Sequence, residues 1–115
     1  MAAYQHLQGE QLAMFMPAHA LMDYYSVENL RRLPMSATTG LHAIKLKESQ
    51  DSGLLESIRD RGVEEPVQVL LSSHHETWEN IRELLNGHHR VSSANHINPN
   101  MEIPVKNVSA KHYGF

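Results

Sequence analysis

Residues 86–90 read Asn-Gly-His-His-Arg, and these residue types at this spacing could hold a phosphate group. Gly87 stands between an apolar run and a stretch with helical spacing, so we expect it just before a helix N-terminus. Such an end leaves several backbone amides unpaired and carries a partial positive charge, and a preceding glycine lets an anion approach closely. Arg90 adds a planar fork that matches phosphate oxygens. The segment therefore predicts an anion-binding loop at residues 87–90.

Two histidines in this loop supply groups whose charge changes near neutral pH. We expect His89 to donate a hydrogen bond to the phosphate and His88 to be the candidate proton shuttle, which makes both candidate catalytic residues. The chain holds nine histidines, but zinc needs three or four ligands at fixed short distances. The histidines and nearby glutamates form no ordered ligand motif, so solvated loop histidines are favoured over a metal site.

The elements that must position this loop can be read on both sides of it. A helix over residues 51–61 would end at Gly62, and Pro66 would open a mostly buried strand that continues through residues 67–71. A second helix would start directly after Gly87 and run to about residue 96. A closing strand over residues 103–108 would lie near a sheet edge, because Pro104 cannot donate to a central ladder.

Two segments fit more than one structure. Residues 41–46 are compatible with a short strand or a loop. In residues 72–86, Ser73 and Glu76 fit a capping box and an apolar stripe follows, which favours a helix. The last of these residues could equally form a strand that leads into Gly87.

Three short motifs occur in an order that resembles a known family. Residues 57–69 read S-I-R-D-R-G-V-E-E-P-V-Q-V, residues 86–94 read N-G-H-H-R-V-S-S-A, and residues 103–105 read I-P-V. Over roughly residues 41–108 the chain resembles the ParB/sulfiredoxin-like superfamily, whose domain is often labelled a ParB-like nuclease domain. The resemblance implies an α/β (α+β) fold with a small mixed sheet and an N-terminal helical extension. It also implies a strand directly before Gly87, which we prefer to the helix.

The resemblance implies nucleotide chemistry at the loop. The nucleophilic cysteine of sulfiredoxin falls on His88, and the chain has no cysteine, so sulfinic-acid reduction is excluded. The ParB branch holds the triphosphate of CTP with a Gly-x-x-Arg segment, which Gly87, Arg90, Ser93 and Ala94 match. The resemblance thus adds Ser93 to Gly87, His88, His89 and Arg90 as a phosphate-binding residue, and implies CTP or ATP with Mg²⁺ as the ligand.

Two departures from the ParB pattern leave alternatives open. Residues 28–32 spell Glu-Asn-x-x-Arg, but they precede the core instead of following it, and no residues remain for a helix-turn-helix DNA reader. Binding of a nucleotide, with or without hydrolysis, is the first hypothesis. A metal-dependent nuclease that acts on DNA is the second. A non-catalytic interaction or regulatory module is the third, with a homodimer or a host protein as partner and a methionine-rich N-terminal arm as contact surface.

Composition bounds these hypotheses. The 115 residues suffice for one domain, which we divide into an N-terminal helical arm and linker (residues 1–40) and the family-like domain (residues 41–115). In the arm, Pro17 would open a helix that runs to about Tyr25. A net charge of −3 argues against coating nucleic acid by bulk attraction. The absence of cysteine, of a membrane-spanning run and of a secretory signal predicts a cytoplasmic protein, and the resemblance suggests a phage or plasmid origin.

Overall fold

The computed structural model describes residues 13–28, 33–37, 40–73 and 80–108. These residues form a mixed α+β fold, as the sequence predicts. The elements in chain order are β1 (Ala13–Pro17), α1 (Ala18–Met22), β2 (Tyr25–Ser26), the 3₁₀ helix η3 (Met35–Ala37), α2 (Leu41–Ser52), α3 (Leu54–Arg61), β3 (Val67–Ser73), β4 (Asn80–Asn86), α4 (His88–Ile97) and β5 (Glu102–Asn107).

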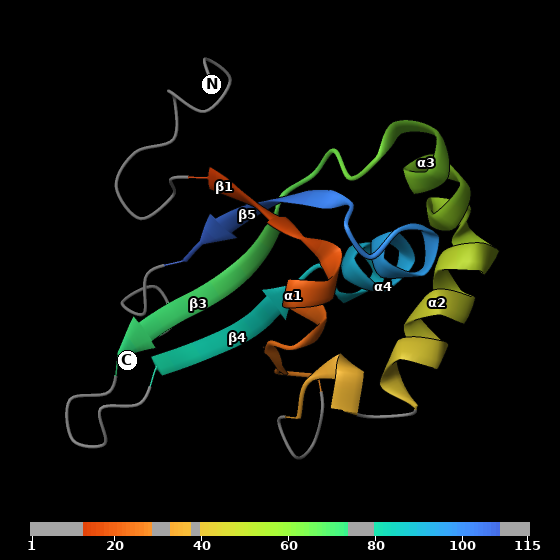
Figure 1. Cartoon of the computed structure of the whole chain (residues 1–115). Helices are drawn as coiled ribbons and strands as arrows, with labels where there is room; N and C mark the ends of the chain where they lie inside the picture. The colour runs from red at the N-terminus through yellow and green to blue at the C-terminus, as the bar shows by residue number, and fades with distance from the viewer. Residues whose placement is uncertain (1–12, 29–32, 38–39, 74–79, 109–115) are drawn as a thin grey trace.

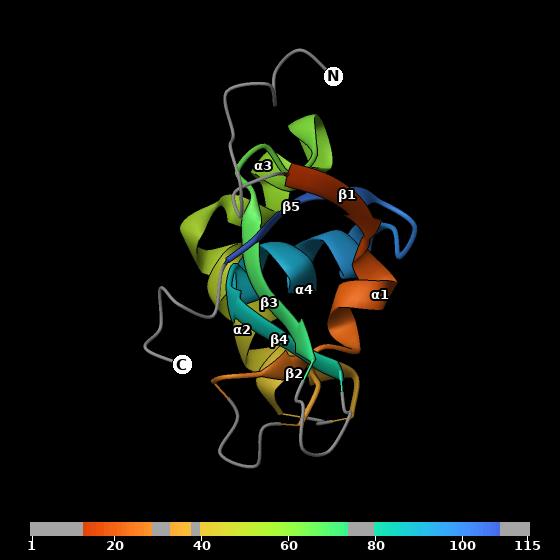
Figure 2. The same ribbon diagram turned by 90° about the vertical axis from the view of Figure 1, so that its left-hand side faces the viewer.

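The five strands form one mixed sheet in the order β1-β5-β3-β4-β2. Strand β3 pairs antiparallel with β4 and parallel with β5, while β1 runs antiparallel to β5 and β2 runs parallel to β4. Helices α2, α3 and α4 lie to one side of this sheet, with α4 between the sheet and α2 (Figures 1 and 2). The apolar core lies between the sheet and the helices and includes Leu21, Val67, Val69, Leu84 and Val91, each fully buried.

The N-terminal stretch differs from the predicted helical arm. Residues 13–17 form a strand, and the helix after Pro17 ends at Met22 instead of near Tyr25. The Ala18 amide donates to the Met101 carbonyl at 2.9 Å, and Leu21 is fully buried. Apolar residues at helical spacing misled the interpretation, because a strand pairing with β5, far along the chain, leaves no local signature. This segment therefore belongs to the same sheet and core as the rest of the fold.

Helix α2 occupies the segment for which the sequence left a strand or a loop open. Only Ser49 among its residues is buried, so the helix lacks the regular apolar stripe by which amphipathic helices are recognised. The helix predicted over residues 51–61 is divided at Gly53, where α2 ends in a left-handed conformation and α3 begins. Gly62 ends α3, as predicted.

The strands and the helix around the loop follow the sequence interpretation closely. Strand β3 begins directly after Pro66, β4 leads into Gly87, and α4 starts at His88. The capping box predicted around Glu76 lies outside the described residues. Strand β5 lies near the sheet edge, as predicted, but it is the second strand, because β1 pairs with its outer side. Pro104 is tolerated there because the pairing of β5 with β3 starts only at Val105.

In the described part of the chain, no helix combines the length and apolarity needed to cross a membrane.

Candidate functional site

Gly87 joins β4 to α4 in a conformation that only glycine adopts readily. Its φ is +105°, and a Cβ built on it would lie 2.5 Å from Cγ1 of Val67 and 3.2 Å from the Val67 Cα. The backbone of the loop is thus pressed against the start of β3. The Val91 amide closes the first helical bond to the Gly87 carbonyl at 3.0 Å, so the amides of the residues before Val91 begin the helix without intrahelical partners. The strand-glycine-helix junction predicted from the sequence is present.

His88 points into the protein and is fully buried. Its Nε2 lies 2.6 Å from Oγ of Ser26, which in turn accepts the Glu28 amide at 3.2 Å. Because that amide uses the hydroxyl as acceptor, the Ser26 proton is free to donate to Nε2. The His88 proton then sits on Nδ1, 2.9 Å from Glu28 Oε2, in a contact without hydrogen-bond geometry that is therefore electrostatic. A side chain so enclosed positions the loop and does not reach a ligand as a proton shuttle would.

Burial lowers the pKa of His88, since a charged imidazole loses its hydration; the Glu28 carboxylate opposes this but does not reverse it. Burial raises the pKa of Glu28. The hydrogen bond from Lys45 and the neighbouring positive charge lower this pKa by more than burial raises it, so the net shift is downward. The pair is therefore a neutral histidine beside a charged carboxylate. Lys45 neutralises that carboxylate through an ion pair with Oε1 of Glu28.

His89 lies at the surface of the same turn. Its Nε2 contacts Oε1 of Glu48 at 2.8 Å, and its side chain is 40% exposed. Glu48 belongs to α2, which is anchored on α4 by Ser49: the Ser49 hydroxyl is buried and lies 3.4 Å from the His89 carbonyl. His89 is thus accessible to a ligand, and Glu48 orients its ring.

Arg90 uses one of its guanidinium nitrogens for hydrogen bonds within the protein. Its Nη1 donates to the carbonyls of Glu65 at 3.0 Å and Pro66 at 2.7 Å, and its side chain is 15% exposed. Of the five N–H donors of a guanidinium, the two on Nη1 are used; Nε and Nη2 make no hydrogen bond to the residues that the structure describes. Arg90 therefore fastens the start of α4 to the segment before β3, and it keeps one edge of its fork for a ligand.

A cavity of about 450 Å³ opens beside this turn. Residues 86–90 line it together with three carboxylates, those of Glu28, Glu48 and Glu65. The carboxylates make the cavity unfavourable for a free phosphate, because like charges repel. No three His, Asp or Glu side chains of the described ranges converge on a metal position. Mg²⁺, however, commonly takes one or two carboxylates and completes its shell with phosphate oxygens and water. Glu28 and Glu48 are the carboxylates present here, and both already pair with Lys45.

The structure separates the sequence-predicted residues into two groups. Gly87, His89 and Arg90 border the cavity, as does the backbone at His88. Ser93 is fully buried one turn further along α4 and does not border the cavity. Sequence reasoning missed Ser26 and Glu48 and placed Glu28 away from the site. The letters Glu-Asn at residues 28–29 were the available signal, but their order along the chain argued against using it.

Comparisons with known proteins assign neither a family nor a function to the chain. A scan against protein-family models, a search of curated proteins and a search of solved structures each found no match.

The position of Arg90 leads to a prediction about stability. Arg90→Ala should lower the free energy of unfolding by about 1–3 kcal/mol, because two hydrogen bonds from a charged donor are lost. Arg59→Ala is the matched control: Arg59 is 47% exposed and, among the described residues, pairs only with Glu56 on the surface of α3, so its loss should cost less than about 1 kcal/mol. Urea unfolding measures both. Equal costs would show that Arg90 does not fasten the loop.

Proposed function

We propose that the chain binds the phosphate groups of a nucleotide, as the Mg²⁺ complex, in the cavity beside residues 87–90. The observation that carries the proposal is the left-handed Gly87, packed on Val67 and followed directly by the first turn of α4. This arrangement places the first backbone donors of α4, at the positive end of a helix, beside the cavity.

The side chains around the turn support the same ligand. The free edge of the Arg90 guanidinium can donate to phosphate oxygens, whereas the Nε2–H of His89 is already donated to Glu48. Glu28 and Glu48 favour a phosphate that arrives with its cation, and Lys45 between them keeps the carboxylates from repelling one another. We propose that the ligand is CTP or ATP and that the protein acts in the cytoplasm. His88 takes a positioning role in this proposal, and hydrolysis is not part of it.

Calorimetric titration with CTP, ATP and GTP, each with and without Mg²⁺, tests the proposal. We expect at least one nucleotide to bind and its affinity to fall when Mg²⁺ is removed. At a concentration a hundredfold above the dissociation constant, the ligand should stabilise the fold by about 2.7 kcal/mol. Arg90→Lys keeps the charge but loses the fork, and Glu28→Gln loses a cation ligand; each should weaken binding about tenfold.

Glu56→Gln is the matched control, because Glu56 is an exposed carboxylate on α3 outside the cavity. It should bind like the wild type. Absence of binding by all three nucleotides with Mg²⁺ would refute the proposal. So would equal affinity in the wild type, Arg90→Lys and Glu28→Gln.

A further inference from the structure

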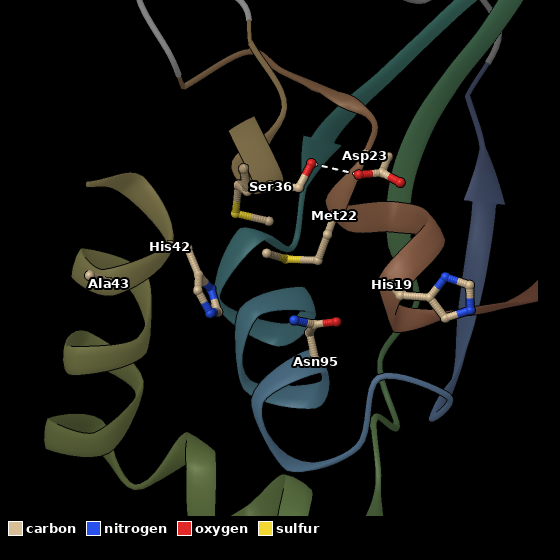
Figure 3. A pocket seen from close by; sticks show the side chains of 8 residues that line it. His19, Met22, Asp23, Ser36, His42, Ala43 and Asn95 are labelled. Atoms are coloured by element: carbon tan, nitrogen blue, oxygen red, sulfur yellow. Dashed lines mark hydrogen bonds between the residues drawn. The ribbon is translucent and has the colours of Figure 1, made fainter. Parts of the chain in front are cut away.

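A second cavity lies between α1, η3, α2 and α4, and its lining shares no residue with the cavity at residues 87–90. Its volume of about 510 Å³ falls in the range of small-molecule sites. Figure 3 shows Met22 and His42 facing each other across it, with Asn95 below and Asp23 and Ser36 above. From this lining we infer that the cavity binds a small organic amine with an apolar body.

The floor of the cavity is apolar and adaptable. Met22 is 5% exposed and Met35 is 1% exposed, and both border the cavity. Thioether side chains fill irregular spaces and make favourable contacts with aromatic rings. The floor therefore accepts the hydrocarbon or aromatic part of a ligand.

One wall carries the imidazole ring of His42. The Ser92 hydroxyl lies 2.9 Å from Nδ1 of His42 and 3.5 Å from Sδ of Met35, so it holds the His42 ring in place. Burial, and then the charge of His96, lower the pKa of His42 and keep the ring neutral. The wall thus carries no charge, and the neighbouring Asn95 amide makes no hydrogen bond to a described residue.

The rim carries a carboxylate. The Ser36 hydroxyl donates to Oδ1 of Asp23 at 2.5 Å, which fixes the carboxylate; Oδ2 makes no hydrogen bond to the part of the chain that the structure describes. No lysine or arginine lines the cavity in the described ranges. His19 also borders the cavity, but its ring points away from Met22 and His42 (Figure 3). A buried apolar floor, an uncharged wall and an anion at the rim together favour an ammonium group at the entrance, with its apolar body inside.

The test uses the full chain labelled with ¹³C at the methionine methyl groups, of which there are six. Met22→Leu and Met35→Leu identify the two floor signals. The probes are phenethylamine, 3-phenylpropan-1-ol and 3-phenylpropionate, which share an aromatic body and differ in the head group. We expect phenethylamine to shift the Met22 and Met35 signals in a saturable manner, the alcohol to do so more weakly, and the carboxylate to leave them unchanged.

Two variants locate the ammonium group. Asp23→Asn should weaken phenethylamine binding about threefold, the range for one exposed ion pair. Asp60→Asn removes the same charge from exposed α3 and should change nothing. Absence of saturable shifts with all three probes would overturn the site. Equal binding of the amine and the carboxylate, or equal effects of the two variants, would overturn the assignment to amines. Neither result bears on nucleotide binding at the other cavity.

Discussion

Gly87→Ala is expected to lower the free energy of unfolding by about 2–5 kcal/mol. Two costs combine at this position. The backbone holds φ at +105°, which an L-residue with a Cβ avoids, and the new Cβ would lie 2.5 Å from Cγ1 and 2.8 Å from Cβ of Val67. Val67 is fully buried at the start of β3, so neither side can move without opening the core. Denaturant unfolding monitored by circular dichroism measures the loss.

Gly53 provides the matched control for this substitution. Its φ is +85°, yet no atom lies within 4 Å of the position that a Cβ would take. Gly53→Ala should therefore cost only the backbone component, about 1–2 kcal/mol. A double variant that also carries Val67→Ala should recover part of the loss from Gly87→Ala, since it frees space for the new methyl group. If Gly53→Ala and Gly87→Ala cost the same, the close approach of the loop to β3 is refuted.

His88→Ala should cost a similar amount, about 2–5 kcal/mol, although the neighbouring His89→Ala should cost less than about 1 kcal/mol. Removal of the His88 ring leaves a cavity and deprives the Ser26 hydroxyl, itself 1% exposed, of its acceptor. His89 pairs with Glu48 at the surface, where water replaces the lost partner. A cost for His89→Ala as large as that for His88→Ala would contradict the buried position of His88.

The free energy of unfolding should also depend on pH through His88. The pKa of His88 is lower in the folded protein than its ordinary value of 6.5, so below pH 6.5 the unfolded chain binds the proton more readily. The free energy of unfolding should therefore fall as the pH drops below 6.5, until the folded pKa is passed. His42 has a lowered pKa as well, so His88→Gln should reduce this slope without removing it. An unchanged slope in His88→Gln would show that His88 is not kept neutral by its surroundings.

The part of the fold that the sequence predicts well is the part whose signals are local. Gly62, Pro66 and Gly87 each mark a change of backbone conformation, and the elements between them follow from apolar spacing. Strand β1 escaped prediction because its pairing with β5 joins residues such as Phe15 and Pro104, which are far apart in the chain. Helix α2 was not predicted because it is largely exposed and has no apolar stripe along one face.

The candidate site divides in the same way. Gly87, His89 and Arg90 are contiguous, and their types and spacing indicated the loop. Ser26 and Glu28 reach it only because β2 runs beside β4, which brings Ser26 to His88 across 62 positions of sequence. Burial also decides what a residue can do. His88 was predicted from the sequence to be a proton shuttle, but it is buried under the loop and supports it. Spacing reveals which groups are near one another, whereas only the packing reveals which of them face solvent.

The central claim is that the backbone at the start of α4 receives the phosphate of a Mg²⁺-nucleotide. The most direct measurement is a titration of ¹⁵N-labelled protein with Mg²⁺-CTP and Mg²⁺-ATP, followed through the amide signals of His88, His89 and Arg90. The account predicts that a nucleotide shifts these three signals together and saturably, that the Asp60 amide on α3 does not respond, and that Gly53→Ala leaves the response intact. Saturable shifts elsewhere in the chain with these three amides unmoved, or no shifts at all, would contradict it.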